Sequence, residues 1–197
     1  MTFLDKIQGY FEDEFNLSSI DSIKLRYSME VIFNEVSKLI LLLILFSILG
    51  FTTDFIYSVI SLLAIRPFTG GLHLKSYAEC FIFTVFFFST SIFLKNNIML
   101  GSHSLILLLI FSFFIILLFA PVAGNNRPIY SNKKLLQFKF IGLTILMIHF
   151  LIAYLFTNKH PYIINSTWVF TLQSIQLLIA KGVNINEKRE IYKQEAN

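Results

Sequence analysis

Charged residues are scarce in this chain: they make up 14% of its 197 residues, whereas a soluble domain usually carries about 25%. Hydrophobic residues make up 55%, with 23 phenylalanines, and the mean hydropathy is +0.69. This shortage of charge argues against a soluble domain. We therefore expect an all-α integral membrane protein, because a helix satisfies its own backbone hydrogen bonds in lipid.

The residues that common catalytic sites require are also few. The single cysteine, Cys80, excludes an internal disulfide. No His-Glu-x-x-His zinc motif and no Gly-x-Ser-x-Gly elbow occurs. An intramembrane aspartyl protease needs two aspartates in its spans, and only Asp54 lies between apolar runs. We expect neither a metal nor a cofactor.

Six apolar runs follow a polar start. They are Leu39–Phe51, Phe55–Ile65, Cys80–Leu94, Ile98–Ala120, Leu135–Phe156 and Tyr162–Ala180. A span needs about 20 residues, so the first two runs form either one interrupted helix or a tight pair.

The basic residues favour the pair. With six spans, every lysine and arginine except Lys95 and Lys159 lies on one side, together with both termini. The positive-inside rule makes that side the cytoplasm. The sequence thus predicts about six transmembrane helices, of which the first two form a short hairpin, with Asp54 as an ordinary residue of the outside turn.

Residues 1–37 are expected to form amphipathic helices outside the hydrocarbon. Their aromatic face either lies in the membrane interface or packs on the membrane domain; it consists of Phe3, Leu4, Ile7, Tyr10, Phe11 and Phe15. Ser18 or Ser19 caps a second helix that runs towards Lys38. Residues 38–181 would form the membrane domain and 182–197 a cytoplasmic tail. We expect no cleavable signal peptide.

A polar segment, Arg66–Cys80, separates two apolar runs, and its thiol and imidazole suffice for nucleophilic acyl chemistry. The alternative is an inert cysteine and a structural histidine. A straight helix would place the Cα atoms of His73 and Cys80 about 10.5 Å apart, near the limit of contact. We therefore predict that Gly70 and Gly71 bend the backbone, with His73 at a bend or frayed helix start and Cys80 on a helix.

The other polar residues of this face have two interpretations each. Glu79 orients His73 or, as we prefer, is solvated or faces the lipid headgroups. Arg66 anchors its helix at the interface, or it reaches a carboxylate or the reacting carbonyl. A second polar segment, Pro121–Lys134, shares the face. It offers Asn125 and Asn126 for an orienting or oxyanion role, and Lys133 and Lys134 either as positive-inside residues or to attract an acidic substrate.

The pattern Arg-x-x-x-Gly-Gly-x-His-x6-Cys, formed by Arg66, Gly70, Gly71, His73 and Cys80, resembles the signature of the accessory gene regulator protein B (AgrB) family. The length, the amphipathic N-terminus, the spans and the later Ala-Pro and Arg-Pro pairs resemble the family as well. The resemblance implies a membrane cysteine endopeptidase of bacterial quorum sensing, with Cys80 as nucleophile and His73 as base.

The same resemblance implies the substrate and the partners. The substrate would be a short amphipathic AgrD-type propeptide, cut before its acidic C-terminal tail through a Cys80 thioester and then cyclised to a thiolactone. The partners would be this propeptide, the lipid bilayer and a second copy of the chain in a homodimer, without nucleic acid. The protein would lie in the bacterial cell membrane with its active site in the cytoplasm. The family's later loop is more basic, whereas here Asn125 and Asn126 precede a single Arg127.

A non-enzymatic peptide exporter or assembly factor is the alternative function. Such a protein needs no reactive thiol at a membrane boundary. It would carry polar residues in the middle of its spans, and the sequence shows few, such as His149.

Overall fold

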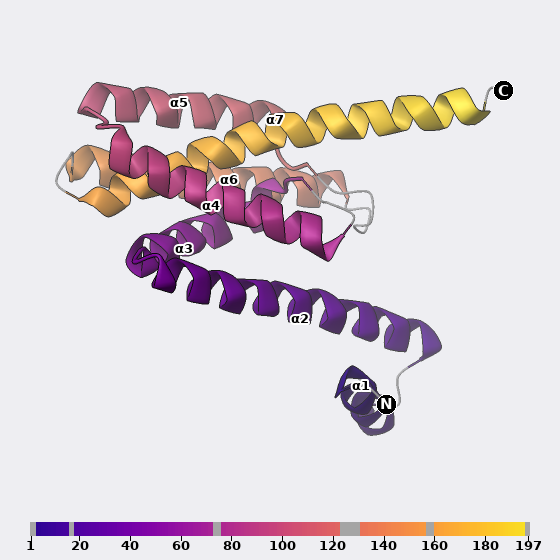
Figure 1. Cartoon of the computed structure of the whole chain (residues 1–197). Coiled ribbons are helices and arrows are strands. Elements are labelled where there is room, and N and C mark those ends of the chain that lie inside the picture. Colours follow the sequence, from indigo (N-terminus) through magenta and orange to yellow (C-terminus); the bar gives the residue numbers. More distant parts are fainter. Residues whose placement is uncertain (1–2, 16–17, 73–75, 123–130, 157–159, 196–197) are drawn as a thin grey trace. The chain divides into compact units, whose positions relative to one another are not determined.

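The computed structural model describes residues 3–15, 18–72, 76–122, 131–156 and 160–195. Within these ranges the chain forms seven helices: α1 (Phe3–Phe15), α2 (Ser19–Ile48), α3 (Thr52–Thr69), α4 (Tyr77–Asn97), α5 (Ser102–Phe119), α6 (Asn132–Leu155) and α7 (Pro161–Glu195) (Figure 1). The expected all-α membrane fold is confirmed. The chain divides into two compact units, Met1–Gly50 and Phe51–Asn197.

The first unit consists of α1 and α2. Ser18 caps α2 by accepting a hydrogen bond from the Asp21 backbone N–H at 3.2 Å, so the expected cap is confirmed. From Ser19, α2 continues through residue 38 to Ile48 without a break. The expected second helix and the first apolar run are therefore one helix, because nothing between them is a helix breaker.

Polar contacts join α1 to α2. Arg26 pairs with Asp5 at 2.5 Å. Gln8 donates to Ser22 at 2.9 Å, and Ser22 in turn donates to Glu12. On α1 the aromatic residues Tyr10 and Phe15 are 65% and 62% exposed, so α2 covers neither of them.

The second unit is built around α7, which packs against α3, α4 and α5 and runs between them in Figure 1. Within the most apolar stretch of its first 23 residues, 56% of the residues are buried, compared with 22% for α4, α5 and α6. Side chains from α3, α5, α6 and α7 form the core; they include Ile65, Leu109, Ile116, Leu146, Phe170 and Leu177. The last apolar run thus forms the central helix of this unit.

Five helices in the described part of the chain are long and apolar enough to cross a membrane: α2, α4, α5, α6 and the Pro161–Val183 part of α7. The chain is therefore a multi-pass membrane protein. α3, expected as the second span, is not among the five. It carries Asp54, Arg66, Pro67 and several hydroxyl residues in 18 positions, and these lower its hydropathy.

Two contacts mark the opposite ends of the second unit. Lys95, at the end of α4, pairs with Asp54, at the start of α3, at 2.7 Å. Both side chains are 14% exposed, so Asp54 is a mostly buried partner in an ion pair rather than an ordinary turn residue. At the other end, the Val122 backbone N–H donates to Thr69 O at 2.9 Å, which joins the end of α3 to the segment after α5.

Candidate functional site

The Gly70–Leu72 segment follows α3 and is tightly held. Gly70 N–H donates to Arg66 O at 2.9 Å and closes the helix. Gly70 then turns with a φ of 77°, a conformation that favours glycine, and pairs with Val122 in a parallel bridge. A Cβ on Gly70 would overlap the Val122 carbonyl. The expected bend is therefore confirmed at Gly70, and the two polar segments of the sequence meet here.

Arg66 links this segment to α7. Its Nη1 donates to Gln176 Oε1 at 3.5 Å and its Nη2 donates to the Leu72 carbonyl at 3.4 Å. The guanidinium thus turns towards the protein and fixes the chain that follows Gly71. The expected roles of Arg66, an interfacial anchor or a contact with a carboxylate or the reacting carbonyl, stay predictions.

The start of α4 positions Cys80. Ser76 Oγ accepts from Glu79 N–H at 3.2 Å, and Glu79 Oε2 accepts from Ser76 N–H at 3.3 Å. This capping box satisfies two backbone N–H groups and sets the first turn. Glu79 is exposed, as expected, and also has a structural role in this box. Cys80 follows it, half-buried, and its N–H donates to Ser76 O at 3.1 Å. Cys80 therefore lies on a helix, as predicted, in its first turn.

The other half of the expected pair, His73, lies outside the described residues, as do Asn125, Asn126 and Arg127. The placement of His73 at a bend and the roles of the second polar segment therefore stay predictions. A straight helix from position 73 to Cys80 does not occur, because α4 begins at Tyr77.

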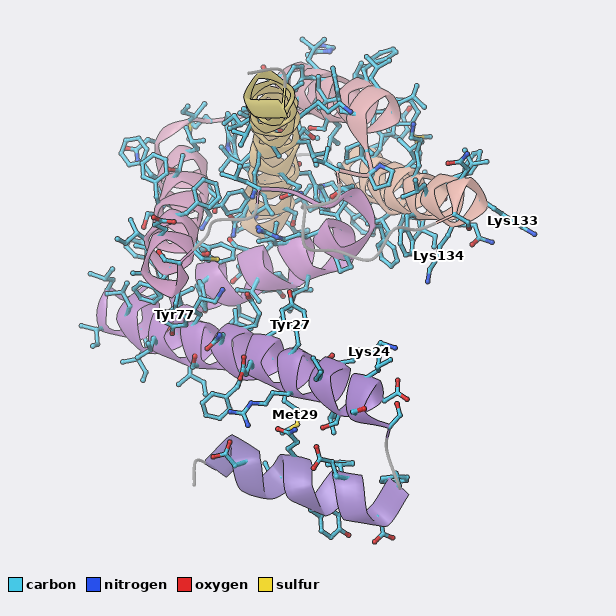
Figure 2. The ribbon with its side chains drawn as sticks, turned by 90° about the vertical axis from the view of Figure 1, so that its right-hand side faces the viewer. Lys24, Tyr27, Met29, Tyr77, Lys133 and Lys134 are labelled. Carbon is cyan, nitrogen blue, oxygen red and sulfur yellow. The ribbon has the colours of Figure 1, made fainter. Side chains whose placement is uncertain are left out.

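Lys133 and Lys134 lie in the first turn of α6, which Ser131 caps. Both side chains are exposed. Figure 2 looks at the end of the second unit where α4 and α6 begin, and shows both lysines pointing outward on the opposite side from Tyr77. The structure thus places the lysines at the same end as Cys80 but away from it.

The sequence analysis missed the polar residues that α7 buries. They are Asn165, Thr167, Thr171, Gln173, Ser174 and Gln176. Gln173 Nε2 donates to Gly70 O at 2.7 Å and to Thr69 Oγ1 at 3.1 Å, so it holds the glycine segment from the other side. The available signal was two amides three residues apart inside an apolar run, which share one helix face.

Groups able to hold a metal ion are not formed by the residues in the described ranges: no three His, Cys, Asp or Glu side chains cluster there. His149, the polar mid-span residue noted in the sequence, faces α7 instead, where its Nε2 lies 3.1 Å from Thr167 Oγ1 and its ring packs edge-on against Phe170. Its contacts are those of a structural residue.

Comparison with known proteins places this geometry in context. The family model described as Accessory gene regulator B matches residues 4–177. An AgrB-like protein of Clostridium beijerinckii is 31% identical, covering 92% of this chain and 91% of that protein. The accessory gene regulator protein B of Staphylococcus aureus strain MRSA252 is 26% identical, covering 89% and 92%. No solved structure matches the chain.

Proposed function

Because this chain belongs to the Accessory gene regulator B family, we propose that it is a membrane cysteine endopeptidase that cuts an AgrD-type propeptide and helps to cyclise the signal peptide. One observation carries the proposal. The only cysteine of the chain lies in the first turn of a capped helix, at the end of the segment that begins with the fixed Gly70–Leu72 stretch.

The first turn of a helix suits a nucleophilic thiol. Reactive cysteines of other proteins are often found at helix N-termini. The Ser76–Glu79 capping box fixes this turn, so the sulfur is held in place before the substrate arrives. Oriented reactants need less reorganisation to reach the transition state.

In the proposed reaction, Cys80 Sγ attacks the carbonyl carbon of the peptide bond that precedes the acidic tail. His73 accepts the thiol proton and passes it to the leaving amine, so the C–N bond breaks and the tail departs. The remaining peptide is held as a thioester on Cys80. A thiol of the substrate then attacks this thioester, a thiolactone forms, and its proton restores the Cys80 thiol.

The second step exchanges one thioester for another, so its equilibrium is nearly balanced. Loss of the tail and exclusion of water from the thioester would favour the ring over hydrolysis. Lys133 and Lys134, which point outward at the same end, would attract the acidic tail in this scheme. They lie away from Cys80, which fits a role in binding the tail rather than in the reaction.

The proposed topology has six spans, with both termini and Cys80 in the cytoplasm. The Val122–Thr69 hydrogen bond and the Asp54–Lys95 ion pair support it, because α3 then connects the two ends of the second unit despite its lower hydropathy. A membrane-impermeant maleimide should label Cys80 in inside-out vesicles. Labelling only in right-side-out vesicles contradicts this topology.

The decisive experiment compares wild-type protein with Cys80→Ala and Cys80→Ser in vesicles with tagged AgrD-type propeptides. Wild type should release the tail, and Cys80→Ala should lower the rate by at least about a thousandfold, since the covalent route is lost. Mass spectrometry should find the acyl adduct on Cys80 when the substrate thiol is replaced by serine. If both variants fold in normal yield and still release the tail, the proposal is wrong.

A binding-only exporter is the second candidate, and the buried polar row of α7 favours it, since polar residues in the middle of spans often line transport paths. Three of these six side chains, however, hydrogen-bond to their own helix, as Thr171 and Ser174 do, and the other three bond to α3 or to Gly70. An exporter would still move the uncut propeptide when Cys80 is replaced by alanine, which an assay of the external medium detects.

A further inference from the structure

Beside the Gly70–Leu72 segment, α7 buries two glutamine side chains, and each has one polar atom without a partner in the part of the chain that the structure describes. Gln173 is 0% exposed and Gln176 is 2% exposed. The unpaired atoms are Gln173 Oε1 and Gln176 Nε2. Since more than about 90% of buried polar groups are hydrogen-bonded, two such atoms on one helix face indicate a missing ligand.

The contacts of each amide fix which atom is left unpaired. Gln176 directs its oxygen to Arg66 Nη1, so its NH2 group must face the other way. Gln173 directs its nitrogen to Gly70 O and Thr69 Oγ1, and Thr69 Oγ1 already donates to Ile65 O. Rotating either amide by 180° would place donor against donor or acceptor against acceptor. The unfilled donor and the unfilled acceptor are therefore not interchangeable.

One donor beside one acceptor selects the chemistry of the ligand. A carboxylate or phosphate offers only acceptors and leaves Gln173 Oε1 unpaired, whereas an ammonium offers only donors and leaves Gln176 Nε2 unpaired. A peptide group offers both, a C=O for Gln176 and an N–H for Gln173. It is neutral, as a buried site prefers.

Gly71 lies directly against these amides. A Cβ on Gly71 would lie 3.2 Å from Gln176 Nε2 and 3.6 Å from Gln173 Nε2, so a side chain at this position would crowd Gln176. Gly70 already pairs with Val122 as one strand pairs with another. The segment is thus shaped for contact with backbone rather than with side chains.

We propose that Gln173 and Gln176 bind one backbone peptide group of the propeptide and so position the chain that Cys80 attacks. The two glutamines are positioning residues, and α4, which carries Cys80, packs against α7. Such a site recognises any sequence in extended form, so side-chain specificity must come from elsewhere. The inference rests on the proposed function.

Gln176→Glu tests the donor with little change in shape. It keeps an oxygen for Arg66 and replaces only the unfilled NH2 group. The probe is the tagged propeptide that wild type cleaves. We expect KM to rise about tenfold with kcat changed less than about twofold, as for a lost hydrogen bond in binding. The melting temperature should stay level or rise, because Arg66 gains a charged partner.

Asn165→Asp is the matched control, since Asn165 is a buried amide on the same helix whose polar atoms are all paired. It should lower the melting temperature and leave KM unchanged. If Gln176→Glu keeps the wild-type KM, the buried NH2 group faces only water and the inference is wrong. The same holds if its KM changes no more than that of Asn165→Asp.

Ester bonds in the tagged propeptide test the acceptor, Gln173 Oε1. Replacing one peptide bond at a time by an ester removes one N–H. A single position near the cut should raise KM severalfold, and combining that ester with Gln176→Glu should give less than the product of the two effects. If no ester position raises KM, the inference is wrong. If wild type cleaves no propeptide, the proposed function fails instead, so the two failures are distinguishable.

Discussion

The two ends of the contact between α3 and α7 bury amide side chains in different ways. At one end, Asn165 Nδ2 donates to Asp54 O at 2.9 Å and to Ser58 Oγ at 3.0 Å, while its Oδ1 accepts from Ser58. At the other end, Gln173 and Gln176 each leave one atom unpaired among the described residues. The amide groups are chemically alike, but of these three amides only the two at the second end leave atoms unpaired in the part of the chain that the structure describes.

This difference separates a structural role from a functional one. An amide whose nitrogen and oxygen are both hydrogen-bonded within the protein joins two helices and has no unpaired atom for a ligand. The unsaturated pair lies at the end that also holds Gly70 and the start of α4, where the candidate nucleophile is found. An exact balance of donors and acceptors is thus a better guide to function on this helix than polarity alone.

The largest expected effect comes from replacing Gly70, at the end of the contact that also holds the start of α4. Gly70→Ala adds a Cβ that overlaps the Val122 carbonyl, at a positive φ. We expect a loss of at least about 3 kcal/mol in unfolding free energy, since strain and overlap add, and no tail release. Gly101→Ala is the matched control, because open space surrounds Gly101. Equal melting temperatures for both variants contradict this prediction.

Breaking the ion pair at the structural end should have the next largest effect. Lys95→Met leaves Asp54, 14% exposed, without its ionic partner. The expected loss is about 2 to 3 kcal/mol, below that of a fully buried pair. Thermal unfolding in detergent measures it, and Asp54→Asn combined with Lys95→Met should recover part of the loss. Propeptide KM should not change, since the pair lies at the end away from Cys80.

Removing a saturated amide should cost somewhat less. Asn165→Ala removes the amide that donates to Asp54 O and to Ser58 Oγ, and we expect a loss of about 2 kcal/mol. Gln176→Met, which removes a half-satisfied amide at similar volume, should cost less than about 1 kcal/mol by the same reasoning. Unfolding curves of the two variants should differ in this order. The reverse order would erase the distinction between the two ends.

The smallest effect concerns the α1–α2 contact, which is held by partly buried polar groups. The hydroxyl of Ser22, and then the amide of Gln8, lower the pKa of Glu12 below its ordinary value of 4.5. A lowered pKa stabilises the folded contact above 4.5, and this contribution is lost as the pH falls through the lowered value. The protection of the α1 amides against hydrogen exchange should therefore decrease only in acid. Glu12→Gln should abolish this pH dependence.

Much of the fold follows from local sequence. Composition predicts membrane helices, Ser18 predicts the start of α2, and a glycine pair predicts the bend at Gly70, because each depends on neighbouring residues. The capping box at Ser76 and Glu79 also has a local sequence pattern, Ser-x-x-Glu before an apolar run. Glu79 is exposed, as expected, and its spacing from Ser76 gives it the second role of closing this box.

Other features depend on residues far apart in the chain. Whether Arg66 points to the interface or inward is decided by Gln176, which no local pattern reveals. Asp54 pairs with Lys95 rather than with solvent because the start of α3 lies beside the end of α4. The low hydropathy of α3 is likewise tolerated because α6 and α7 cover it, and a hydropathy scale does not record such cover.

The pairing of Gly70 with Val122 has a mechanical consequence. It joins the chain before α4 to the chain after α5, so the two helices and their connection form a closed ring of chain. Ring closure removes an independent degree of freedom: the strand-like stretch at Gly70 cannot move without displacing Val122. Changes of length at the Gly101 turn, far from this closure, would then be absorbed locally, which makes that turn the natural position for an inserted label.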